Sequence, residues 1–232
     1  MTTREIEIPS GKLRAYSASP IVSRGVAVLV LPEIYNLNGW IRKVAERYAG
    51  LGFEVLVPDL YWRQTPDPQL DYNPADQQTG RQLASALDRE VAINDLAEIV
   101  RAWRAELPEG TPVIAVGYCL GGELAFLLAA SGAVDGASGY YPTRMENHLQ
   151  HGAAVKVPTQ LHFGELDYRT PAELIDQVRQ ATVESPMVEI IVHAGADHGF
   201  GRFGHPPYHA AAAALAQTRT LALADALIGK RH

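Results

Sequence analysis

The segment Pro112-Val-Ile-Ala-Val-Gly-Tyr-Cys-Leu-Gly-Gly122 is the most informative part of this chain. Its first half is a continuous apolar run, typical of a strand buried on both faces, and residues 120–131 predict a helix. Gly117 and Gly121 stand two residues before and two after Cys119, the pattern of a sharp strand-to-helix turn that presents a nucleophile. A free cysteine can instead be a small buried apolar residue. The strand, the glycines and the helix together favour a nucleophile.

An acid and then a histidine follow such a nucleophile in chain order. Asp167 comes just after a predicted strand over 158–163, and His198 lies in a glycine-rich loop after a predicted strand over 188–192. Because catalytic groups collect at the carboxyl ends of parallel strands, we expect Asp167 to orient His198, and His198 to act as the base for Cys119. Three neighbouring titratable residues rank below these two: Glu165, His193 and Asp197.

Two backbone N–H groups are candidates for stabilising the oxyanion that an attacking thiolate would generate. The Leu120 N–H opens the helix after Cys119, where the helix dipole favours negative charge. The second donor in this architecture comes from the loop after an early strand, predicted here over 25–31, and Ile34 is the candidate. Glu33 precedes it, and from the residues alone it is either a surface glutamate or a functional one.

The remainder of the chain alternates strands with helices, which predicts an α/β fold with a mostly parallel central sheet and helices on both faces. Two alternating runs around Pro9-Ser10-Gly11 predict an N-terminal β-hairpin. We expect one domain over residues 1–232. The other predicted segments are a helix capped by Asn38, strands over 53–57 and 136–140, a loop over 63–78, and helices over 80–107, 171–183 and 208–228.

Composition excludes several classes of protein. A single cysteine rules out an intrachain disulfide and a cysteine-only zinc site, and a net charge of −6 argues against a nucleic-acid or anionic-membrane partner. No apolar signal core opens the chain, and polar residues interrupt its alanine-rich C-terminal region. We therefore expect a cytoplasmic, monomeric protein that needs no metal and no cofactor.

Six segments together resemble the dienelactone hydrolase family over about residues 25–225: LPEIYNLN, FEVLVPDLYWRQ, VGYCLGGELAF, SGYY, FGELD and GADHGFGR. The resemblance implies an α/β-hydrolase fold and a triad of Cys119, Asp167 and His198 acting on a small ester or lactone that carries a carboxylate. It further implies that Glu33 contacts the resting thiol until substrate displaces it, and that Arg202 binds the substrate carboxylate.

The sequence departs from this family at one substrate-binding pair. The family has an arginine and, four residues later, a tyrosine where this chain has Gln77 and Arg81. Arg81 could restore the lost charge from one helical turn away, or it could be an exposed helix arginine. Three functions follow: a dienelactone-like hydrolase that works through a thioester, a general small-ester carboxylesterase without a carboxylate clamp, and a non-catalytic ligand-binding domain. The third is disfavoured because all three triad residues are present.

Overall fold

The computed structural model describes residues 2–228 and contains one eight-stranded sheet. The strands lie in the order β1-β2-β4-β3-β5-β6-β7-β8, and all six from β4 to β8 run parallel. Their bounds are β1 Thr2–Ile8, β2 Gly11–Ala18, β3 Ala27–Leu31, β4 Glu54–Pro58, β5 Val113–Tyr118, β6 Gly136–Tyr140, β7 Thr159–Gly164 and β8 Val188–His193. The parallel sheet of an α/β fold, predicted from the alternation of elements, is confirmed.

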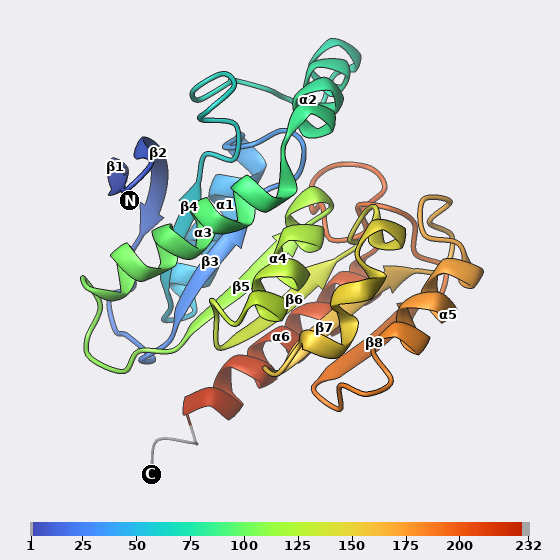
Figure 1. The fold of residues 1–232 in the computed structure, drawn as a ribbon. Helices are drawn as coiled ribbons and strands as arrows, with labels where there is room; N and C mark the ends of the chain where they lie inside the picture. The colour runs from blue at the N-terminus through green and yellow to red at the C-terminus, as the bar shows by residue number, and fades with distance from the viewer. Residues whose placement is uncertain (1, 229–232) are drawn as a thin grey trace.

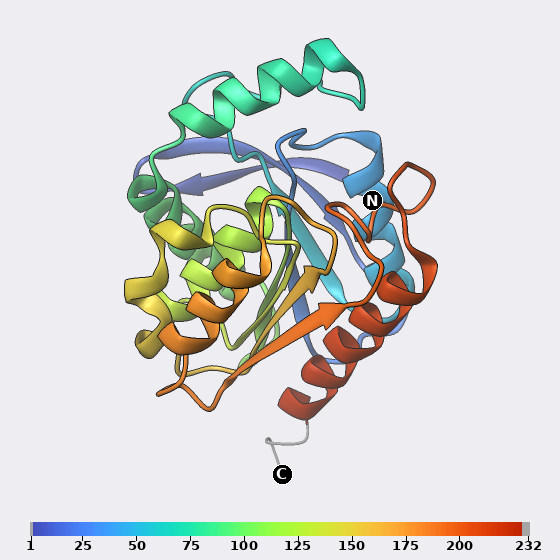
Figure 2. The same cartoon turned by 90° about the vertical axis from the view of Figure 1, so that its right-hand side faces the viewer.

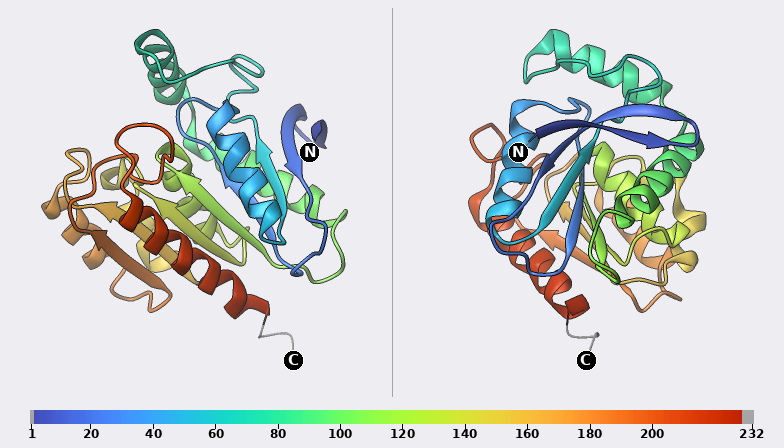
Figure 3. Two further views of the ribbon diagram at one scale, coloured as in Figure 1. Left: turned by 180° about the vertical axis from the view of Figure 1, so that it is seen from behind. Right: turned by 90° about the vertical axis from the view of Figure 1, so that its left-hand side faces the viewer.

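Helices cover both faces of this sheet (Figures 1 and 2). Helices α1 (Gly39–Gly50) and α6 (Ala210–Ile228) cover one face, where their apolar residues join one core cluster, and both lie in front of the sheet when the molecule is seen from behind (Figure 3, left). Helices α3 (Arg89–Arg104), α4 (Leu120–Ser131) and α5 (Ala172–Ala181) cover the other face. The central strands are therefore buried on both sides, which explains their unbroken apolar sequences.

The N-terminal hairpin forms as predicted and extends the parallel sheet at one edge (Figure 3, right). Strand β1 pairs antiparallel with β2, which pairs antiparallel with β4. Alternate residues of the hairpin, including Ile6, Ile8 and Leu13, are buried in the core beneath α3, while their neighbours are exposed or half-buried. The period of two thus reports one buried face in β1, whereas β2 also buries Tyr16 and Ala18 on its other face.

The segment 63–107 corrects two predictions. Helix α2 (Pro74–Ala86) begins inside the predicted loop 63–78, and the predicted helix 80–107 is broken at Leu87 and Asp88, after which α3 begins. Asn73 caps α2 by accepting from the Asp76 N–H, and the Asp88 side chain caps α3. The apolar periodicity continued through the break and concealed it, whereas the two caps determine where each helix starts.

Helix α2 lies across the top of the molecule, at the end where the parallel strands finish (Figures 1 and 2). Only Gly80 and Ala84 of this helix are buried. Two short 3-10 helices, Met145–Asn147 and Leu149–Ala154, follow β6. No helix among residues 2–228 combines the length and apolar character that crossing a membrane would require.

Candidate active site

Cys119 lies on a strained turn between β5 and α4. Its φ of 55° and ψ of −114° are rare for any residue but glycine, at a cost on the order of 1–3 kcal/mol. The flanking glycines allow this turn, because a Cβ on Gly117 would lie 1.8 Å from the Gly121 carbonyl oxygen and one on Gly121 would lie 2.0 Å from the Leu31 carbonyl oxygen. Cys119 is 8% exposed and lines a cavity.

His198 and Asp167 meet across the loops that follow β8 and β7. The His198 Nδ1 lies 2.7 Å from Asp167 Oδ2, and both side chains are buried. The two rival carboxylates are directed elsewhere: Asp197 accepts from the backbone N–H of His198 at 2.6 Å, and Glu165 accepts from the Gly195 N–H at 2.8 Å. Asp167 is therefore the carboxylate that faces the imidazole.

The electrostatics of this pair favour a charged histidine. Burial disfavours the imidazolium, but the Cys119 thiolate and the Asp167 carboxylate outweigh it and raise the pKa of His198 to about 9. Burial likewise acts to raise the pKa of Asp167, and its hydrogen bond to His198 outweighs this and lowers it. The arrangement can hold a thiolate beside an imidazolium, which is the activated state of a cysteine nucleophile.

His193 lies outside this arrangement, as expected for a buried histidine in the edge strand β8. Its Nε2 lies 3.1 Å from Nδ1 of His162, and the two rings stack. Burial lowers the pKa of His162 to about 3 and that of His193 to about 4, so both rings are neutral near pH 7.

Glu33 and Arg202 form a buried ion pair at the edge of the cavity. Arg202 Nη2 donates to Glu33 Oε1 at 2.9 Å, and its Nε lies 3.2 Å from Oε2. The Tyr72 hydroxyl donates to the same carboxylate at 2.9 Å, and the guanidinium lies 4.7 Å above the Tyr72 ring. None of the hydrogen bonds of Glu33 within residues 2–228 goes to the Cys119 thiol, so in this structure Arg202 and Tyr72 hold the carboxylate.

The cavity above Cys119 has a volume of about 740 Å³, within the range of pockets that enclose small molecules. Ile34, Leu120 and Arg81 line it, with Arg81 exposed on α2. Gln77 lines it too, and its amide donates to the Tyr35 hydroxyl at 3.1 Å. Every candidate from the sequence except Asp167 therefore lines this cavity, and Asp167 contacts His198 beside it.

Sequence reasoning missed a buried polar network beside this cavity. Glu123 on α4 has no exposed surface and accepts from Arg89 Nε at 2.8 Å, and its Oε1 lies 2.9 Å from His148 Nε2. Arg89 also donates to the Ala84 and Leu87 carbonyls at the end of α2. A glutamate inside an otherwise apolar helix was the available signal, because a buried carboxylate requires a partner.

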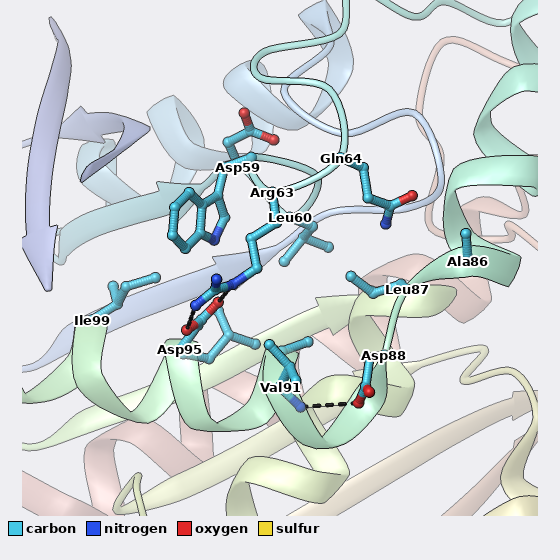
Figure 4. A pocket seen from close by; sticks show the side chains of 13 residues that line it. Asp59, Leu60, Arg63, Gln64, Ala86, Leu87, Asp88, Val91, Asp95 and Ile99 are labelled. Atoms are coloured by element: carbon cyan, nitrogen blue, oxygen red, sulfur yellow. Dashed lines mark hydrogen bonds and ion pairs between the residues drawn. The ribbon is translucent and has the colours of Figure 1, made fainter. Parts of the chain in front are cut away.

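A second, smaller cavity of about 140 Å³ lies between α3 and the segment after β4 (Figure 4). Two of the charged side chains that line it are already paired, because Arg63 forms a bidentate ion pair with Asp95 at 2.7 and 2.8 Å. The rest of the wall combines apolar residues such as Leu60 and Ile99 with Asp59, Gln64 and Asp88, and no cysteine, serine, threonine, lysine or histidine lines it. Residues 2–228 also hold no group of three or more histidine, cysteine or acidic side chains arranged for a metal ion.

A strained turn that holds a cysteine at the centre of a parallel sheet, with an acid and a histidine after later strands, is typical of an α/β hydrolase. The family model described as the dienelactone hydrolase family matches residues 13–227. The chain belongs to this family and is a carboxylic ester hydrolase.

Known relatives agree with this assignment over almost the whole chain. A carboxymethylenebutenolidase from Pseudomonas putida is 34% identical over 227 residues, covering 95% of each chain. Carboxymethylenebutenolidase 1 from Cupriavidus pinatubonensis is 32% identical over 227 residues, covering 96% of this chain and 97% of the relative. A crystal structure assigned to a dienelactone hydrolase of Klebsiella pneumoniae is 25% identical, with a TM-score of 0.83, and the match covers 97% of this chain and 98% of that one.

Proposed function

We propose that this hydrolase cleaves a lactone or activated ester that carries a carboxylate, with Cys119 as nucleophile, His198 as general acid and base, and Asp167 as the residue that orients the imidazole. The observation that carries the proposal is the 2.7 Å contact between His198 and Asp167 beside a thiol held on a strained turn in the same cavity. The relatives named carboxymethylenebutenolidase support the lactone as substrate class.

Binding and activation are coupled through Arg202. Its guanidinium is held by Glu33, so a substrate carboxylate that binds Arg202 competes with Glu33 for the same donors. Displacement of the Glu33 carboxylate allows the Cys119 thiol to ionise, and its proton passes to His198 to give a thiolate and an imidazolium. Arg81 supplies a second positive charge to the substrate carboxylate from α2.

The thiolate of Cys119 attacks the carbonyl carbon, and the N–H groups of Leu120 and Ile34 stabilise the oxyanion. The leaving alkoxide or enolate departs and takes the proton of His198. A water molecule, deprotonated by His198, hydrolyses the thioester and restores the thiol. An enolate leaves readily from a thiolate adduct, so a lactone with a stabilised leaving group suits this nucleophile better than an amide.

The test is turnover of a panel of aryl esters and lactones by Cys119→Ala. We expect kcat to fall by about a thousandfold or more, because the residual rate comes only from binding and the oxyanion donors. Intact-mass measurement of the wild-type protein mixed with a slow ester should show an acyl adduct that Cys119→Ala lacks. Wild-type rates in Cys119→Ala would refute the mechanism.

A carboxylesterase without a carboxylate clamp is the second candidate, and Gln77 in place of the family's arginine favours it. The two candidates differ in the substrate feature that they recognise. A lactone that bears a carboxylate and its neutral methyl ester should be compared as substrates. A preference for the carboxylate that Arg202→Gln removes supports the clamp, and equal kcat/KM values support the carboxylesterase.

A further inference from the structure

The active-site cavity is more positive than the rest of the protein. Five arginines and three carboxylates line it, although the whole chain has a formal net charge of −6. A cavity with one sign of charge raises the local concentration of ligands of the opposite sign. The number of arginines exceeds what a single substrate carboxylate requires.

The five arginines fall into two groups. Arg89 and Arg202 are already paired, with Glu123 and Glu33 respectively. Within residues 2–228, no carboxylate oxygen lies within 4.0 Å of the guanidinium nitrogens of the other three, namely Arg81, Arg144 and Arg169. Unpaired guanidinium groups on the wall of a cavity are available to bind an anion.

Arg144 and Arg169 lie on a different side of the nucleophile from Glu33. Arg144 follows β6 and Arg169 follows β7, whereas Glu33 follows β3. The strand order β3-β5-β6-β7 places Cys119, at the end of β5, between the two groups. The cavity therefore has positive charge on both sides of the thiol. Arg202 and Arg81 lie on the side of Glu33, and Arg144 and Arg169 lie on the side of β6 and β7.

Both arginines line the cavity, with Arg144 exposed and Arg169 half-buried. Arg144 has a φ of 54°, a conformation that is uncommon for residues other than glycine, asparagine and aspartate. The backbone N–H of Arg169 donates to the Asp167 carboxylate at 3.0 Å, and its guanidinium stacks 4.4 Å from the Tyr168 ring. Stacking leaves the in-plane N–H donors of a guanidinium free for an anion. Glu146 is the carboxylate nearest in sequence to Arg144 and forms no ion pair with it, whereas Asp167 is nearest to Arg169 and its pKa is lowered in part by the charge of that arginine.

We propose that Arg144 and Arg169 form a second anion subsite, so that the preferred substrate is a dianionic ester or lactone with an acidic group on each side of the scissile carbonyl. This inference rests on the proposed function, because the first acidic group is the carboxylate bound by Arg202. The cavity volume of about 740 Å³ leaves room for such a substrate. Two guanidinium groups bind one carboxylate through several charge-assisted hydrogen bonds.

Two matched esters test the subsite. Mono(4-carboxyphenyl) adipate has a carboxylate on the acyl part and another on the leaving group, and mono(4-carbamoylphenyl) adipate replaces the second with a neutral amide of the same shape. Absorbance of the released phenols gives kcat/KM for each. We expect the wild-type protein to prefer the dianionic ester, mainly through a lower KM.

Arg144→Gln and Arg169→Gln should each reduce the ratio of the two kcat/KM values by about tenfold, the effect of losing charged hydrogen bonds to one group. Arg101→Gln removes the same charge from an exposed pair on α3 and should leave the ratio at its wild-type value. A ratio near one in the wild-type protein, or a ratio that neither cavity variant changes, would overturn the proposal.

Measuring the binding of compounds that are not hydrolysed distinguishes a failure of this inference from a failure of the proposed function. The anilides that adipate forms with 4-aminobenzoate and with 4-aminobenzamide are not substrates of the expected reaction, and their affinities for Cys119→Ala can be measured by calorimetry. Tighter binding of the diacid, lost when Arg144 or Arg169 is also replaced, supports the subsite even if no ester is hydrolysed. Hydrolysis of both esters with equal affinity for both anilides would leave the proposed function standing and refute the subsite.

Discussion

Gly80→Ala should move α2 relative to the loop that carries Ile34 and lower the activity, while the protein remains folded. Gly80 packs against the loop that holds Ile34, and a Cβ there would lie 2.5 Å from the Ile34 carbonyl oxygen. Ordinary contacts begin near 3.4 Å, so α2 or the Ile34 loop must move by about 0.9 Å. The Tyr61 hydroxyl, which donates to the Ile34 carbonyl at 3.2 Å, opposes movement of the loop.

The expected effects on activity and stability differ in size. Overpacking costs about 1–3 kcal/mol, and replacing glycine inside a helix regains about 1 kcal/mol, so the free energy of unfolding should fall by about 0–2 kcal/mol. Displacing an oxyanion donor by about 1 Å can cost up to a hundredfold in rate. We therefore expect kcat/KM for an aryl ester to fall by about ten- to a hundredfold in a protein that remains folded.

Steady-state kinetics and urea unfolding together measure both quantities. Gly50→Ala is the matched control, because Gly50 ends α1 with no atom within 4 Å of the position of its Cβ. That variant should retain wild-type kcat/KM. Wild-type kcat/KM in Gly80→Ala would show that the spacing between α2 and Ile34 does not position an oxyanion donor.

Two further predictions concern titration and the buried network. In Cys119→Ala the pKa of His198 should fall from about 9 toward its ordinary value of about 6.5, which an NMR titration of the ring would detect, and an unchanged pKa would contradict the coupling. Because the pKa of His198 is raised in the folded protein, the net stabilisation of its imidazolium contributes to stability fully below about pH 6.5 and is lost as the pH rises through about 9. Glu123→Ala should lower the free energy of unfolding in urea by about 3–5 kcal/mol, since Arg89 would lose its buried partner, and a loss below about 1 kcal/mol would show that water replaces the carboxylate.

The central part of the fold could be predicted because each of its elements is indicated by a short, continuous stretch of sequence. Continuous apolar runs located β3 and β5, and the glycines around Cys119 located the turn. The helix break at Leu87 was missed because the apolar stripe continues across it, and only the capping of α3 by Asp88 reveals the second start. Helix periodicity reports which face is buried and carries little information on where a helix is interrupted.

In the site, too, some features could be predicted from short sequence segments and others could not. Chain order predicted that Asp167 and His198 lie close together, and the structure has them 2.7 Å apart, because strand ends in a parallel sheet meet at one edge. The ion pair between Glu33 and Arg202 joins residues 169 positions apart, and the contact of Glu123 with His148 depends on how the segment after β6 folds back. Such pairings depend on tertiary packing and have no signature in a local pattern of residues.

The cysteine at the turn also determines how this protein would respond to oxidants. Cys119 is the only cysteine in the chain, so a sulfenic acid formed there cannot condense with a second thiol of the same chain. Recovery then requires a small thiol that can enter the cavity and form a mixed disulfide at Cys119. The same cavity that admits the substrate therefore also sets which reductants can reach the oxidised sulfur.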